Sequence, residues 1–133
     1  MPAAQISQDE KGMIVILEKI VEQGLLYDFY GELLTEHQRQ IYEGIVYENL
    51  SLGEIAMEQG ISRQGVHDIV KRCDKALLGY ENRLKLIERF MKIKERIKEI
   101  DRWSELYENE EIDDKSSYCK KVRQLSAEIL EEL

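Results

Sequence analysis

The stretch that decides the fold is Ser51-Leu-Gly-Glu-Ile-Ala-Met-Glu-Gln-Gly-Ile-Ser-Arg-Gln-Gly-Val-His-Asp-Ile-Val-Lys-Arg72. Its first serine is followed three residues later by Glu54, the spacing of a helix capping box, and Gly60 closes this short helix in a tight turn. Ser62 then caps a longer helix whose apolar residues recur at helical spacing. A short helix, a glycine turn and a longer helix are typical of a helix-turn-helix, so we predict one at about residues 35–78.

The second helix of this unit, Ser62–Lys75, is the predicted recognition helix. Ile55 and Ala56 of the first helix would pack against Val66, and the exposed start of the recognition helix would enter the major groove of DNA. Arginine there can bond guanine, glutamine can bond adenine, and lysines can hold phosphates. The candidate DNA-binding residues are Ser62, Arg63, Gln64, His67, Asp68, Lys71, Arg72 and Lys75.

The charge distribution leaves two uses for this unit open. The net charge of −8 argues against nucleic-acid binding, because phosphate contacts need lysine and arginine. However, residues 60–104 hold 12 basic and 7 acidic side chains, against 3 and 11 in residues 1–59 and 4 and 9 in residues 105–133. The alternative is a structural or protein-docking helix-turn-helix. Gly65 favours it, since glycine weakens a helix by about 1 kcal/mol relative to alanine.

Helical spacing of apolar residues continues on both sides, without a strand pattern. A first helix should start at Met13 and end near Tyr27–Gly31, with Gly31 as a left-handed stop, and Thr35 should cap the next. A helix of about 25 residues should run from Tyr80, and a final one from Tyr118.

These patterns predict an all-α fold of about six helices, a helix-turn-helix with a long C-terminal helix. The expected parts are a flexible N-terminal extension at residues 1–12, a helix-turn-helix domain with the long helix at 13–104, and an acidic linker with a C-terminal helix at 105–133. Along the long helix, Leu86, Phe90, Ile93, Ile97 and Ile100 follow the steps of a heptad seam. This seam is either intramolecular core or the interface of a homodimer.

Other residue patterns do not indicate catalysis. His37 and His67 are isolated, and the acidic run Glu108–Asp114 lacks the glycine-centred spacing of a calcium loop. Without a nucleophile–base pair or a cofactor motif, we expect no enzyme, no cofactor and no metal site. Tyr27, Phe29 and Tyr30 should pack in a core or an interface rather than stack on bases, and Cys73 should be a small buried hydrophobe. No apolar run reaches the roughly 18 residues of a membrane span, so we expect a cytoplasmic protein.

Several segments together resemble the YlxM family of bacterial proteins. They are Tyr27-Asp-Phe-Tyr-Gly-Glu-Leu-Leu-Thr35, Gln38-Arg39, Ser51-Leu-Gly-Glu-Ile-Ala56, Ile61-Ser-Arg-Gln64 and Lys71-Arg72. The resemblance covers about Leu17–Trp103. It departs from the family pattern at Gly65 and His67, where alanine and tyrosine are usual.

This resemblance implies a helix-turn-helix like region 4 of sigma factors, within the winged-helix-like DNA-binding superfamily. It also implies a DNA-binding or regulatory protein encoded beside the gene for the signal recognition particle GTPase. Two functions follow as hypotheses. The protein is a DNA-binding regulator, acting as a homodimer through the long helix. Alternatively, it docks on the signal recognition particle GTPase or its RNA and modulates its activity.

Overall fold

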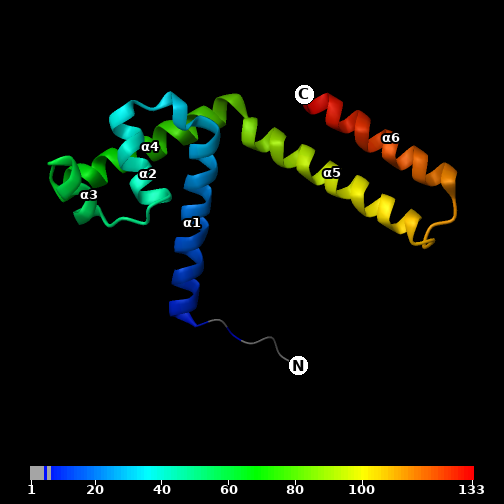
Figure 1. Ribbon diagram of the computed structural model, residues 1–133, viewed down its shortest axis with the longest axis horizontal. Coiled ribbons are helices and arrows are strands. Elements are labelled where there is room, and N and C mark those ends of the chain that lie inside the picture. Colours follow the sequence, from blue (N-terminus) through cyan, green and yellow to red (C-terminus); the bar gives the residue numbers. More distant parts are fainter. Residues whose placement is uncertain (1–4, 6) are drawn as a thin grey trace. The chain divides into compact units, whose positions relative to one another are not determined.

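The chain is helical throughout the part described by its structure, a computed structural model covering residue 5 and residues 7–133 without the side chains of residues 16 and 17. The elements in order are α1 (Gln8–Tyr30), the 3-10 helix η1 (Gly31–Leu33), α2 (Glu36–Val46), α3 (Leu52–Gln59), α4 (Arg63–Leu84), α5 (Leu86–Glu108) and α6 (Lys115–Glu132) (Figure 1). This confirms the predicted all-α helix-turn-helix fold with a long C-terminal helical region. The chain divides into two compact units, the first ending at Leu84 and the second spanning Lys85–Leu133. None of the described helices is long and apolar enough to cross a membrane.

The core of the first unit lies where α2, α3 and the start of α4 meet. Partly buried side chains such as Ile45, Leu50 and Ile61 pack around it. Removing this apolar surface from water is the main force that holds the three short segments together. The buried residues at its centre are Ile41, Ile55, Ala56 and Val66.

Capping boxes begin α2 and α3, as the sequence predicts. The Thr35 hydroxyl accepts from the Gln38 N–H, and the Gln38 side chain accepts from the Thr35 N–H in return. Ser51 and Glu54 repeat this arrangement at α3. Each box satisfies backbone N–H groups that a helix start leaves without partners.

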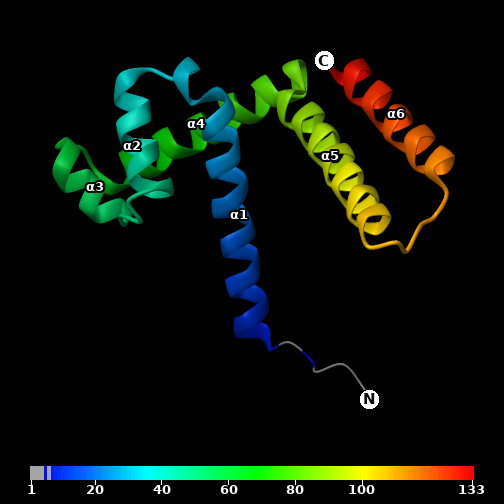
Figure 2. The same cartoon turned by 45° about the vertical axis from the view of Figure 1, so that its right-hand side comes forward.

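The C-terminal half of α1 crosses α4, while its N-terminal half extends past the other helices of the first unit in both views (Figures 1 and 2). Leu26 and Tyr30 are buried on the crossing side. Met13, Val15 and Val21, toward the other end of α1, are exposed. The helix is therefore anchored mainly through its second half.

The second unit is a hairpin of two antiparallel helices, α5 and α6, which run side by side in both views (Figures 1 and 2). The Arg96 guanidinium lies 2.6 Å from the Glu128 carboxylate. The rings of Tyr107 and Tyr118 stack with their centres 4.7 Å apart. Leu125 is the one residue of this unit that is fully buried.

Two expectations about the first helix need correction. Residues 1–12 are predicted as an irregular extension, yet α1 already begins at Gln8, because Ser7 and Glu10 form a capping box; residues 1–4 and 6 lie outside the described residues. Gly31 is not a left-handed stop, since its φ is −57°. Its missing side chain matters for another reason: a Cβ there would lie 2.8 Å from the Tyr27 ring.

The long helix also differs from the prediction. The spacing predicts a single helix from Tyr80 to about residue 104, but α4 runs on to Leu84 and α5 begins at Leu86. Lys85 between them has a left-handed backbone with φ of 58°. An α-helix cannot continue through that conformation, so the helix breaks there. α5 then belongs with α6 in the second unit, whereas the sequence assigned it to residues 13–104.

Candidate nucleic-acid interface

The turn between α3 and α4 is made by Gly60, Ile61 and Ser62. Gly60 has φ of 66°, a left-handed conformation that glycine adopts without a Cβ clash. The Ser62 hydroxyl accepts from the backbone N–H of Gly65 at 2.9 Å, which caps α4. A Cβ on Gly65 would lie 3.1 Å from that hydroxyl oxygen. The glycine that lowers the helix propensity of α4 therefore also leaves room for its cap.

α4 separates into an apolar side and a polar side. Val66, Cys73 and Leu77 are fully buried and fix the helix against the rest of the first unit. Residues four apart lie on one face of a helix, so the candidate residues form two adjacent rows on the opposite side. One row is Arg63, His67, Lys71 and Lys75, and the other is Gln64, Asp68 and Arg72. The structure brings these seven together beside Ser62; all are exposed except His67, which is partly buried.

Hydrogen bonds within this surface tie down part of it. The Gln64 amide donates to Asp68 Oδ1 at 3.0 Å. His67 Nδ1 lies 3.8 Å from the same carboxylate and has no hydrogen-bond partner among the described residues. This bond uses one N–H of the amide and fixes its direction, so a base contact from Gln64 would use the other N–H and the amide oxygen. The sequence alone does not show that the Gln64 amide bonds Asp68.

Four cations on this side of α4 are available to a ligand. Within the part of the chain that the structure describes, no ion pair within 4 Å involves Arg63, Lys71, Arg72 or Lys75. Unpaired lysine and arginine side chains along one helix face are the groups that replace counterions on a phosphate backbone.

Two residues join this surface that the sequence did not single out. Leu52, at the start of α3, lines an open hollow together with Arg63, Gln64 and His67. Arg83 lines another hollow with Lys75 and extends the basic side of α4 by two turns. Arg83 lies beyond the predicted recognition helix, which ends at Lys75, whereas α4 runs on to Leu84. The helix length decides that Arg83 shares this face.

A buried polar cluster holds α4 against α1 and α2. Tyr42 is fully buried, and its hydroxyl donates to Asp74 Oδ1 at 2.5 Å. The Gln23 amide donates to the same carboxylate at 3.0 Å. Burial, the bond to Asp74 and the negative charge of Asp74 together hold the pKa of Tyr42 well above its usual range. Three helices thus meet at one carboxylate directly behind the candidate interface.

The neighbouring thiol and aromatic side chains are structural. Burial, with a smaller contribution from Asp74, raises the pKa of Cys73 to about 11, so the thiol stays protonated and unreactive. The Tyr30 hydroxyl donates to Glu81 at 2.5 Å, and the ring of Tyr27 stacks on that of Tyr42. Tyr27, Phe29 and Tyr30 each lie against another aromatic ring of the first unit, as expected of packing residues.

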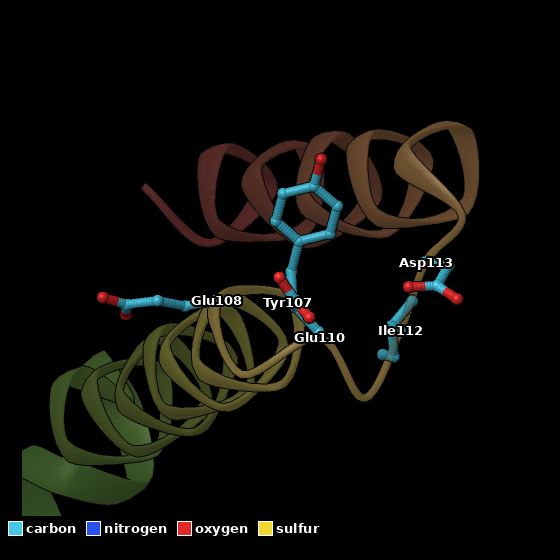
Figure 3. Close-up of a pocket in the computed structure, with 5 residues that line it drawn as sticks. All are labelled: Tyr107, Glu108, Glu110, Ile112 and Asp113. Atoms are coloured by element: carbon cyan, nitrogen blue, oxygen red, sulfur yellow. The ribbon is translucent and has the colours of Figure 1, made fainter.

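The acidic segment between α5 and α6 lines a separate hollow (Figure 3). The side chain of Glu108 points away from that of Asp113, so the two carboxylates do not converge. Asp114 accepts hydrogen bonds from the Ser117 hydroxyl and the Ser116 N–H, which lower its pKa and cap α6. Among the residues described, no group of three or more His, Cys, Asp or Glu side chains could hold a metal ion.

Comparisons with known proteins agree with the fold. The model of the UPF0122 family, described as "Putative helix-turn-helix protein, YlxM / p13 like", matches residues 17–121. A UPF0122 protein of Thermoanaerobacter sp. strain X514 is 39% identical over 107 residues, which is 80% of this chain and 90% of the relative. One from Clostridium botulinum is 46% identical over 76 residues, covering 57% and 70% of the two chains. No solved structure matches the chain.

Proposed function

We propose that this chain, which belongs to the UPF0122 family of YlxM/p13-like proteins, binds DNA through the polar side of α4. The observation that carries the proposal is the set of cations on that side, Arg63, Lys71, Arg72 and Lys75, which have no ion pair with the described residues. They lie on a helix that the capped turn at Ser62 and the buried polar cluster at Asp74 hold in place. A rigid basic helix in a helix-turn-helix is the geometry that docks in a major groove.

The residues divide by their place along α4. Arg63 and Gln64 lie in the first turn, the part of a recognition helix that contacts base edges. Lys71, Arg72 and Lys75 lie about two to three turns further on, where they would contact phosphates. The Ser62 hydroxyl, which caps α4, would lie at the edge of the groove. His67 and Asp68 would influence which base pairs bind. The expected role is that of a regulator in the cytoplasm, where a homodimer would present two such helices.

The test is a binding titration of the full chain on a random-sequence duplex library, followed by the selected duplex. Arg63→Ala should weaken specific binding by about 1–3 kcal/mol, and Lys71→Ala should lower the salt slope by about 1. Lys120→Ala, an exposed lysine on α6, is the matched control and should change neither. Binding that does not depend on salt, or no binding across the library, would refute DNA recognition.

A second candidate function rests on the acidic character of the first helices. Residues 1–59 hold 11 acidic and 3 basic side chains, and Glu48 and Glu58 are exposed. An excess of acidic side chains suits a basic ribonucleoprotein partner. With the YlxM resemblance, this supports docking on the signal recognition particle GTPase or its RNA.

A pull-down of this chain with the protein and the RNA of the signal recognition particle distinguishes the two functions. If the second holds, Glu48→Lys with Glu58→Lys should abolish capture while Arg63→Ala leaves it intact. If capture is lost only with Arg63→Ala, the basic side of α4 is the contact, and Glu48 and Glu58 are not.

A further inference from the structure

The hairpin of α5 and α6 does not bury enough apolar surface to be complete by itself. Leu125 is its one fully buried side chain. Ile97 on α5 remains 53% exposed and Leu130 on α6 remains 71% exposed. Two helices of this length are normally stabilised by packing into a bundle of three or more, because a pair leaves apolar sides in water.

The apolar stripe on α5 runs along the edge of its contact with α6. Ile93, Ile97 and Ile100 follow steps of four and three, so they lie in one row. Ile93 and Ile100 are partly buried, whereas Ile97 between them is exposed. Arg96, one position away, bonds Glu128 and so marks the side that α6 covers. The row is therefore only half covered.

The exposed charges beside this row change sign along α5. Lys94 and Lys98 lie in its first half, and Asp101 and Glu105 follow in its second half, all exposed. Each pair has like charges four residues apart, which is unfavourable in a helix that stands alone. An antiparallel second α5 would bring the lysines of one copy beside the acidic pair of the other, and the reverse. The pattern is thus complementary to itself under a twofold axis.

We infer that the α5–α6 hairpin docks on the hairpin of a second copy of this chain, with the two α5 helices antiparallel and crossing between Ile97 and Ile100. The apolar rows of both copies are then buried in a four-helix bundle. The charged pairs flank the contact and fix its direction, as charges beside a heptad seam do. The inference is independent of DNA binding, because the interface contains no residue of α4.

The experiment is a measurement of molecular mass by sedimentation equilibrium on the full chain without DNA. The mass should be twice the 15.7 kDa of one chain. Ile97→Asp should give a monomer at the same concentration. Ile97 is exposed in the single chain but would be buried in the dimer, where an aspartate would place a charge in the apolar contact. Met57→Asp is the matched control: Met57 is 86% exposed on α3, so this variant should remain a dimer. Far-UV circular dichroism verifies that both variants keep their helices.

Charge reversal tests the direction of pairing. Lys94→Glu with Lys98→Glu should weaken the dimer by about tenfold, and so should Asp101→Lys with Glu105→Lys. All four substitutions in one chain restore opposite charges across an antiparallel contact and should restore the dimer. A monomeric wild-type chain would overturn the inference. So would a variant with all four substitutions whose dimer is as weak as the dimers of the two double-substitution variants. So would a dimer that survives Ile97→Asp and dissociates with Val21→Asp, which would place the interface on α1.

Discussion

The hydrogen bond between Tyr42 and Asp74 gives a prediction whose size follows from the structure. Tyr42→Phe removes the hydroxyl that donates to Asp74 Oδ1 at 2.5 Å and keeps the buried ring. Asp74 retains the Gln23 amide at 3.0 and 3.3 Å, so its carboxylate is not left without a donor. The substitution therefore tests one bond to a charged acceptor, with little change in packing.

The expected loss at pH 7 is about 2 kcal/mol of unfolding free energy. Hydrogen bonds to charged groups contribute about 1.5–3 kcal/mol, and the remaining amide bond to Asp74 places this case in the lower half of that range. Tyr47→Phe is a matched control, since Tyr47 also donates to a carboxylate, that of Asp28, but is exposed. Water can replace that bond, so the control should change stability by only about 0.5 kcal/mol.

The difference between wild type and Tyr42→Phe should also depend on pH. The pKa of Tyr42 is raised on folding, so its stabilising effect is complete below the unfolded value of about 10 and is lost as pH rises toward the folded value. Wild type should lose about 1.4 kcal/mol per pH unit above pH 10 through this group, and the phenylalanine variant should not. The gap of about 2 kcal/mol should therefore shrink to about 0.6 at pH 11.

Urea unfolding followed by far-UV circular dichroism at pH 7, 10 and 11 measures these free energies. Trp103 is the single tryptophan and lies in α5, so its fluorescence follows the second unit separately. A loss below about 0.5 kcal/mol at pH 7 would show that the bond contributes nothing beyond packing. A gap that stays constant between pH 7 and 11 would show that folding does not raise the pKa of Tyr42.

Three glycine substitutions and one double-mutant cycle test the local geometry. Gly60→Ala should destabilise the first unit by about 1–2 kcal/mol, because the left-handed φ of 66° is retained with a Cβ; thermal unfolding measures it. Gly79→Ala should stabilise α4 by about 1 kcal/mol, since a Cβ there meets nothing within 4 Å. Gly44→Ala should lose that gain, because its Cβ would lie 3.2 Å from a side chain of α3, and equal gains at both glycines would contradict this close packing. A double-mutant cycle on Arg96 and Glu128 should give a coupling energy of about 1 kcal/mol or less, because both side chains are about one-third exposed; a larger value would show that the pair is shielded from water.

The helix-turn-helix could be predicted because its signals are short in sequence. A capping box, a glycine turn and a run of helical spacing each involve residues within a few positions, so the local chain encodes them. Gly60 is an example: its left-handed conformation follows from the helix that it ends and the serine cap two residues later. The polar side of α4 follows as well, since burial of Val66 and Cys73 turns the remaining residues outward.

Other features could not be read from local patterns. The break at Lys85 carries no glycine or proline signal, so an unbroken helix was the reasonable expectation. The bond between Gln64 and Asp68 is one of several that residues four apart on a helix can form, and the sequence alone does not select it.

By itself, the sequence determined the all-α class, the turn at Gly60 and the row of cations that begins at Arg63, because caps, turns and helix periodicity act over a few residues. Only the tertiary structure decided which helices share a core. In the structure, Asp74 accepts hydrogen bonds from Tyr42 and Gln23, which are 32 and 51 positions away in the sequence. The structure also pairs α5 with α6 in the second unit. Such contacts depend on which faces meet in space, and many pairings of amphipathic helices satisfy the same local pattern.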